Sequence, residues 1–205
     1  MGNTYPTKEP PPTPDLSLPS HCPELGIYSN TNWDNASFAL YTLIDLPHTE
    51  LQTIATTLEE RWMQASDYSD THLIRIPQTH NFANKTLQDI LSVQIAMDKE
   101  MTPRSDAGAD GDLGWWPNAF IVVVEREWEE RGLLFVYADD DEEEVGKKKK
   151  KGMFAMDKYF FKPKDAYMML SSLVFGDEYL ERSKELYEIG EDGLTGLERE
   201  GVDGY

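Results

Sequence analysis

Apolar residues recur at helical spacing in two segments of the chain's first half. In residues 49–65 the pattern predicts a helix that begins with a capping box of Thr49 and Gln52. A second helix is predicted after Asn84, a residue type that favours the cap position. The apolar positions are Leu51, Ile54, Ala55, Leu58 and Trp62 on the first helix, and Leu87, Ile90, Leu91 and Ile95 on the second.

Strand signals in the first half are shorter. Residues 71–77, THLIRIP, predict a strand that Pro77 ends. Residues 24–28, ELGIY, are a candidate for another short strand. Residues 29–47 are ambiguous between helix and strand, and we interpret them as a short helix.

Two continuous apolar runs in the second half predict buried strands. Residues 118–125 are β-branched and apolar at both alternating sets of positions, which is typical of an interior strand. Residues 133–138 repeat this pattern. The seven residues between them, 126–132, suit a hairpin link, so we expect the two strands to be antiparallel neighbours. Residues 153–161 predict one further strand.

Two helices are predicted after these strands. Asp165 opens the first and Gly176 closes it, and Asp177 is the expected cap of the second. Helices that alternate with strands, followed by a strand meander and two helices, indicate a mixed sheet covered by helices. We therefore expect a single compact α/β (mixed α+β) domain with an antiparallel central strand pair.

The chain divides into three parts by composition. Residues 1–23 contain seven prolines and few large apolar residues, so we expect a disordered arm. Residues 190–205 are acidic and glycine-rich, and we expect a flexible tail. The domain spans residues 24–189, with flexible loops predicted at 98–114 and 139–151.

The chain is strongly acidic. Its 205 residues include 38 acidic and 19 basic side chains, which gives a formal net charge of -19. Such a surface repels a phosphate backbone, so we expect no nucleic acid partner and favour a basic protein partner. The single cysteine, Cys22, forms no internal disulfide, and no apolar run approaches the ~20 residues of a membrane span. We therefore expect no membrane partner and a cytoplasmic protein, with the nucleus as the alternative.

The sequence contains no strong catalytic or metal-binding motif. The four histidines, His21, His48, His72 and His80, lack paired ligand spacing, although His72 and His80 bracket one predicted strand. Residues 105–114 begin like a calcium loop, but Pro117 stands where the loop needs its final glutamate. Serine elbows and glycine-rich phosphate loops are absent from the sequence. We expect neither a metal nor a cofactor.

Tryptophans in predicted loops form the best candidate interaction patch. Trp115 and Trp116 follow a polar loop, and Trp128 lies in the link between the two interior strands. A loop tryptophan either packs on the core or anchors an interface, and the sequence leaves both open. The candidate patch consists of Trp115, Trp116, Glu127, Trp128, Glu129 and Glu130.

One charged block stands out between two predicted strands. Six acidic residues at 139–144 precede five lysines at Lys147–Lys151. Because the charges nearly cancel, we interpret the block as a loop insertion whose ion pairs are weak. The alternative is that the lysines form a nuclear-import or phosphate-binding patch.

The segments WPNAFIVVVEREWEERGLLFVYADDDEEE and DKYFFKPKDAYMMLSSLVFGDEYLERS resemble a family of small intracellular proteins known only as a domain of unknown function, with fungal and actinobacterial members. The resemblance covers about residues 25–188, and it implies an α/β fold without an activity or catalytic residue to carry over. The proline-rich arm, the loop at 98–114 and the charged block depart from the family's pattern.

Two functional hypotheses follow from these observations. The first is a non-catalytic protein-interaction module that uses an acidic surface and the tryptophan patch. The second is a small hydrolase-like enzyme in which carboxylates at the ends of the central strands, such as Glu125 and Asp139, act as acid and base. A buried carboxylate in a pocket favours the second, and a flat apolar patch favours the first.

Overall fold

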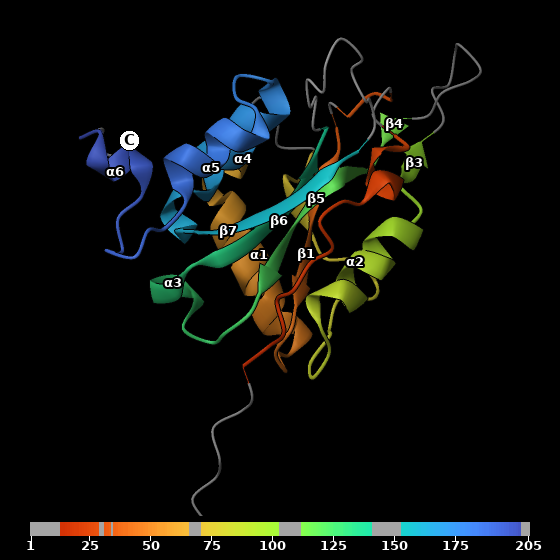
Figure 1. Ribbon diagram of the computed structural model, residues 1–205, viewed down its shortest axis with the longest axis horizontal. Helices are drawn as coiled ribbons and strands as arrows, with labels where there is room; N and C mark the ends of the chain where they lie inside the picture. Colours follow the sequence, from red (N-terminus) through yellow and green to blue (C-terminus); the bar gives the residue numbers. More distant parts are fainter. Residues whose placement is uncertain are drawn as a thin grey trace, which may run out of the picture.

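A computed structural model describes residues 13–28, 31–33, 35–65, 71–102, 112–140 and 153–201, and for 101 and 102 the backbone only. Its main sheet has five strands in the order β2–β1–β5–β6–β7 (Figure 1). They are β1 (Ser37–Thr42), β2 (Ile74–Arg75), β5 (Trp115–Val123), β6 (Leu133–Asp139) and β7 (Ala155–Phe161). A small second sheet pairs β3 (Glu100–Thr102) with β4 (Asp112–Leu113). The expected mixed α/β fold is confirmed.

The first half of the sheet is parallel. Strand β1 lies between β2 and β5 and pairs in parallel with both. Helix α1 (His48–Gln64), which connects β1 to β2, packs on one face of the sheet. Helix α2 (Leu87–Ala96), which lies between β2 and β5 in the sequence, packs on the opposite face. The chain therefore leaves the carboxyl end of β1 for one face and reaches β5 from the other face.

The second half of the sheet is antiparallel, as the short link predicted. Ile121 of β5 faces Phe135 of β6, which in turn faces Tyr159 of β7. The link contains the one-turn helix α3 (Trp128–Arg131) and ends at Gly132. Gly132 has a φ of +91°, and a Cβ atom there would lie 2.7 Å from the carbonyl oxygen of Phe161. Only glycine fits this return into the sheet.

The carboxyl-terminal helices cover the same face as α1. Helix α4 (Ala166–Phe175) follows the 3-10 turn η2 (Pro163–Asp165) and ends, as predicted, at Gly176, whose backbone is left-handed. Helix α5 (Leu180–Tyr187) buries Leu180, Ser183 and Tyr187. In Figure 1, α1, α4 and α5 lie on one side of the sheet, and α2 lies on the other.

Two predicted elements are wrong in type. The segment interpreted as a short helix, residues 29–47, contains β1, whose six residues are all buried. Phe38 packs toward α1 and Tyr41 toward α2, so this strand is apolar at both alternating sets of positions. Such a run lacks the period that separates a strand from a buried helix. The candidate strand at 24–28 is mainly the 3-10 turn η1 (Pro23–Gly26).

Helix starts were also misplaced. Helix α1 begins at His48 after Pro47 and has no side-chain cap, so Thr49 and Gln52 form no capping box. Helix α2 is capped by Thr86, which forms a capping box with Asp89. Helix α5 begins after Tyr179 rather than at Asp177. Of these three helices only α2 uses a side-chain cap, and packing determines where α1 and α5 begin.

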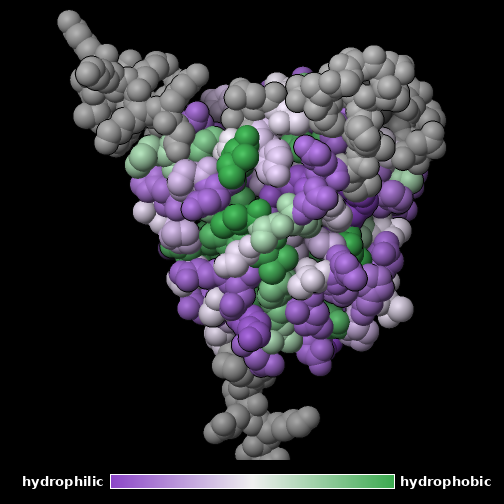
Figure 2. Space-filling model, turned by 90° about the vertical axis from the view of Figure 1, so that its right-hand side faces the viewer, coloured by the Kyte–Doolittle hydropathy of each residue, from purple (hydrophilic) through white to green (hydrophobic). Residues whose placement is uncertain are grey.

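The expected disorder of residues 1–23 is wrong for residues 13–23. The Cys22 amide donates to the Phe154 carbonyl (2.9 Å), and the Met156 amide donates to the Ser20 carbonyl (2.9 Å), so the segment extends the sheet beside β7. Leu16 and Leu18 pack on the sheet face that carries α2. In Figure 2, which views this side, apolar residues form a vertical band between hydrophilic ones. Residues 1–12 lie outside the described part.

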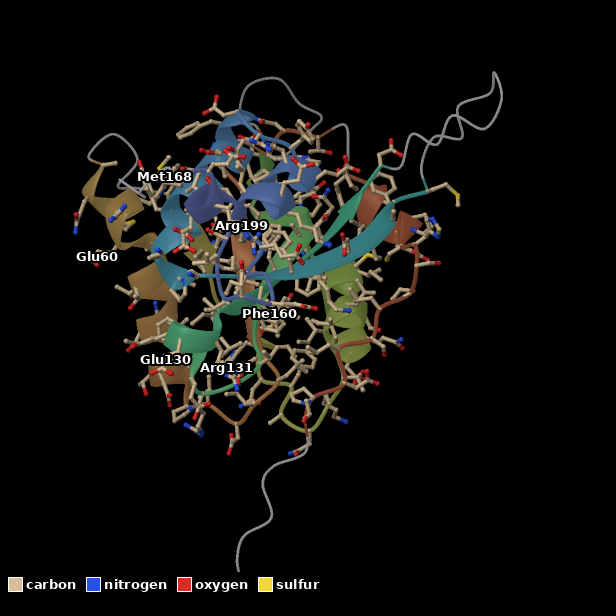
Figure 3. All side chains as sticks on the ribbon, turned by 60° about the vertical axis from the view of Figure 1, so that its left-hand side comes forward. Glu60, Glu130, Arg131, Phe160, Met168 and Arg199 are labelled. Carbon is tan, nitrogen blue, oxygen red and sulfur yellow. The ribbon has the colours of Figure 1, made fainter. Side chains whose placement is uncertain are left out.

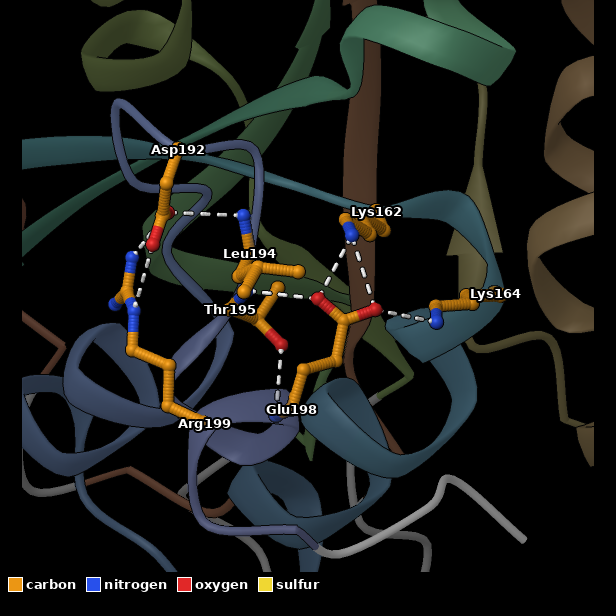
Figure 4. Close-up of polar contacts among 7 residues, drawn as sticks. All are labelled: Lys162, Lys164, Asp192, Leu194, Thr195, Glu198 and Arg199. Carbon is orange, nitrogen blue, oxygen red and sulfur yellow. Dashed lines mark hydrogen bonds and ion pairs between the residues drawn. The ribbon is translucent and has the colours of Figure 1, made fainter.

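The expected flexible tail at 190–205 is also wrong as far as residue 201. Helix α6 (Gly196–Arg199) starts at a capping box in which Thr195 and Glu198 exchange hydrogen bonds. The Glu198 carboxylate accepts from Lys162 (2.7 Å) and Lys164 (2.8 Å), and Arg199 bonds to Asp192 (Figure 4). The bonds of Glu198 attach the segment to Lys164 in η2 and to Lys162 just before it. The two lysines lower the pKa of Glu198 to about 2.

We expect a variant that lacks residues 1–22 to be less stable than the full chain by about 3 kcal/mol, because it loses two sheet hydrogen bonds and the apolar contacts of Leu16, Leu18 and Cys22. For a chain of this size this corresponds to roughly 6–12 °C in Tm, measured by circular dichroism. A variant that lacks only residues 1–12 keeps every described contact and is the control. Equal Tm values for both variants would show that the segment adds nothing.

We expect the substitution Glu198→Gln to lower stability by about 1 kcal/mol at neutral pH, since its ion pairs are partly exposed. The folded pKa of about 2 lies below the ordinary 4.5, so this contribution is present above pH 4.5 and is lost as the pH falls toward 2. Urea unfolding between pH 7 and pH 3 measures it. Exposed Glu191→Gln is the control, and a difference that does not change with pH would contradict the assignment.

Candidate functional site

A crevice of about 760 Å³ lies at the edge of the sheet where the parallel strands β1 and β5 end. This is the lower edge in Figure 1, near α3. In open α/β sheets, ligands bind outside the carboxyl ends of parallel strands, at the point where successive connections take opposite faces. The lining residues are Thr13–Asp15, Leu43–Asp45, Ala83–Lys85 and Val124–Glu127.

The end of β1 forms the floor of the crevice. The Leu43 amide donates to the Val123 carbonyl (2.9 Å), so β1 and β5 stay paired up to the edge. The next residues turn away because the Thr42 hydroxyl accepts from the Ile44 amide (3.1 Å) and donates to the Ile44 carbonyl (2.9 Å). Leu43, Ile44 and Val124 thus bring apolar side chains to the site.

Two further segments form the walls. Asn84 adopts a positive φ of 63° in a tight turn, in which the Asn81 side chain accepts from the Ala83 amide (3.0 Å). The other wall comes from the amino-terminal segment, where the Asp15 carbonyl accepts from the Leu87 amide (3.0 Å) at the start of α2. The Asp15 carboxylate accepts from the Ser17 amide (2.9 Å), which lowers its pKa. The amino-terminal segment is therefore part of the site.

Acidic side chains outnumber basic ones in the lining. There are four acids, Asp15, Asp45, Glu125 and Glu127, and two bases, Lys85 and Arg126. Arg126 is held at the rim, since it donates to the Asp45 carbonyl (2.7 Å) and lies 3.7 Å from the Glu50 carboxylate. Glu125 lies 3.8 Å from Arg131 of α3. An apolar floor with an acidic surround suits a ligand that has an apolar body and a cationic end.

The suggested acid and base do not meet. Glu125 follows the carboxyl end of β5, whereas Asp139 ends β6, which runs antiparallel to it. The seven residues of β6 separate the two positions by roughly 20 Å. The structure thus contradicts a catalytic pair of Glu125 and Asp139, because antiparallel neighbours end at opposite edges of a sheet.

The structure also divides the candidate tryptophan patch. Trp115 and Trp116 start β5, at the edge opposite the crevice. The Trp116 ring is buried and stacks on Phe38 with ring centroids 4.6 Å apart. The Trp115 ring lies beneath the Arg75 guanidinium at 4.2 Å. These two tryptophans belong to the packing of the amino ends of the strands.

The remaining patch residues lie in the link between β5 and β6. Glu127 lines the crevice, and Trp128, the first residue of α3, is buried. Glu129 and Glu130 are exposed on α3. Figure 3 shows Glu130 and Arg131 together on this helix, far from Met168 of α4. Of the six residues of the predicted patch, Glu127 alone lines the crevice.

His72 and His80, which bracket the predicted strand, have different partners. His72 Nδ1 lies 2.8 Å from the buried carboxylate of Glu59, before β2 begins. His80 follows β2 and faces His48 at the carboxyl edge. The lysines of the charged block, Lys147–Lys151, lie outside the described residues.

Comparisons with known proteins do not add a function: no family model, curated protein or solved structure matches the chain. The resemblance to a family of unknown function therefore stays a prediction. In the described part of the chain, helices long and apolar enough to cross a membrane are absent. Clusters of three or more metal-ligating His, Cys, Asp or Glu side chains are likewise absent from that part.

Proposed function

We propose that the protein is a non-catalytic protein-interaction module whose crevice binds a basic, extended segment of a partner protein. The observation that carries this proposal is the position of an acid-bordered apolar crevice at the carboxyl ends of β1 and β5. The proposal keeps the basic partner expected from composition and moves the binding site from the tryptophans to the crevice.

The shape and chemistry of the crevice support a lysine or arginine side chain as the anchor. These side chains bury an aliphatic stem against apolar groups and keep the charged end in a polar rim. The half-buried Ile44 offers apolar surface for the stem, while Leu43 and Val124 are buried and line the crevice. Glu125 and Glu127 offer partners for the charge. A volume of about 760 Å³ lies in the range of ligand pockets and accommodates an anchor together with neighbouring residues.

Long-range charge supports the same class of partner. With a net charge of -19, the protein attracts a basic segment at separations up to about the screening length of ~8 Å at physiological salt. Such attraction mainly raises the association rate, while contacts in the crevice determine the dissociation rate. The cytoplasm is our proposed compartment, because a single cysteine leaves the fold independent of disulfides.

A displayed library of random peptides tests this function. We expect the selected sequences to be enriched in Lys or Arg next to apolar residues. The double variant Glu125→Lys/Glu127→Lys should weaken binding of a selected, fluorescently labelled peptide at least about tenfold, because it reverses the charge of the rim. Fluorescence polarisation measures the Kd.

The matched control is the double variant Glu129→Lys/Glu130→Lys, which makes the same change in net charge on the exposed surface of α3. We expect it to weaken binding less than threefold. Equal losses in the two double variants would mean that only general charge attracts the peptide. That result, or selected peptides without cationic residues, would contradict the proposed site.

A further inference from the structure

Two histidines from separate elements face each other at the carboxyl edge. His48 is the first residue of α1, and His80 lies in the loop after β2. His48 Nδ1 lies 3.4 Å from His80 Nε2, and the ring planes are tilted by 53°. The His48 side chain is exposed, and His80 is half-buried.

The hydrogen bond of the other His80 nitrogen decides which atom carries its proton. His80 Nδ1 lies 2.9 Å from the Pro77 carbonyl oxygen, which can only accept. The neutral ring therefore has its proton on Nδ1 and directs the lone pair of Nε2 toward His48. Metal-binding histidines in proteins are commonly oriented in this way, with the second ring nitrogen donating to a carbonyl.

Backbone hydrogen bonds hold the two segments that carry the histidines. The His80 carbonyl accepts from the Thr42 amide (2.9 Å), which attaches the loop to the end of β1. The Pro47 carbonyl accepts from the amides of Glu50 (3.0 Å) and Leu51 (3.1 Å), which fixes the start of α1 next to His48. Since β1 joins both segments, the backbones of the two histidines are held close together.

The separation of the two nitrogens is compatible with tetrahedral coordination of a metal. With metal–nitrogen bonds of about 2.05 Å, a tetrahedral angle places two ligand nitrogens about 3.4 Å apart, and a right angle places them about 2.9 Å apart. The observed 3.4 Å matches the tetrahedral geometry that zinc adopts.

We propose that His48 Nδ1 and His80 Nε2 bind a zinc ion, with water or a partner's side chain completing its coordination. In the metal-free protein, the N–H group of His48 Nδ1 donates a hydrogen bond to His80 Nε2. When zinc binds, the neutral His48 ring carries its proton on Nε2 instead, so the number of protons is unchanged. The site is open, because among the described residues a third metal-ligating side chain does not join the pair.

Isothermal titration calorimetry with zinc chloride tests the proposal. We expect one zinc ion to bind the full-length protein with a micromolar Kd, and each of His48→Ala and His80→Ala to weaken binding at least about tenfold. His21→Ala, an exposed histidine elsewhere, is the matched control and should leave the Kd unchanged. Cobalt(II) in place of zinc should give the intense visible absorption of a tetrahedral site.

Because 38 acidic side chains also attract cations, the variants decide the outcome. The proposal is overturned if the double variant His48→Ala/His80→Ala binds zinc as tightly as the unaltered protein. It is also overturned if the unaltered protein binds no zinc below about 1 mM. Peptide binding by the crevice does not depend on this site. Failure of one proposal therefore leaves the other to stand on its own test.

Discussion

Parallel pairing of β1 with β5, buried on both faces, is the constraint on which the rest of the structure depends. Each strand needs a covering layer on both sides, so α1 occupies one face and α2 the other. The chain must then diverge at the carboxyl ends of the two strands. The crevice results from this divergence, and the His48–His80 pair lies at the same edge.

The amino-terminal segment links stability to the site. The sheet face that carries α2 also includes apolar side chains of β6, and the short helix α2 alone does not cover them. Leu16, Leu18 and Cys22 cover them, and the same segment reaches the crevice through Asp15. A proline-rich composition excludes a helix there, but it does not exclude an extended segment that packs against a sheet.

The sequence predicted those features that depend on local pattern. Strands β5 and β6 follow from continuous apolar runs, and their antiparallel pairing follows from the short link. Strand β1 was missed because its run fits a buried helix equally well. The crevice was missed because Leu43–Asp45 and Val124–Glu127 are about 80 residues apart and meet only through the strand order. The sequence left open whether Trp116 is buried, because its burial depends on contacts with residues far away in the sequence, such as Phe38.

The central claim is that the carboxyl ends of β1 and β5 form the binding site. The most direct measurement is an NMR titration of the labelled full-length protein with a short peptide of alternating lysine and leucine. We predict that the largest amide shifts occur in Leu43–Asp45, Ala83–Lys85 and Val124–Glu127. Shifts concentrated on α4 to α6, or spread evenly over the acidic surface, would contradict the account.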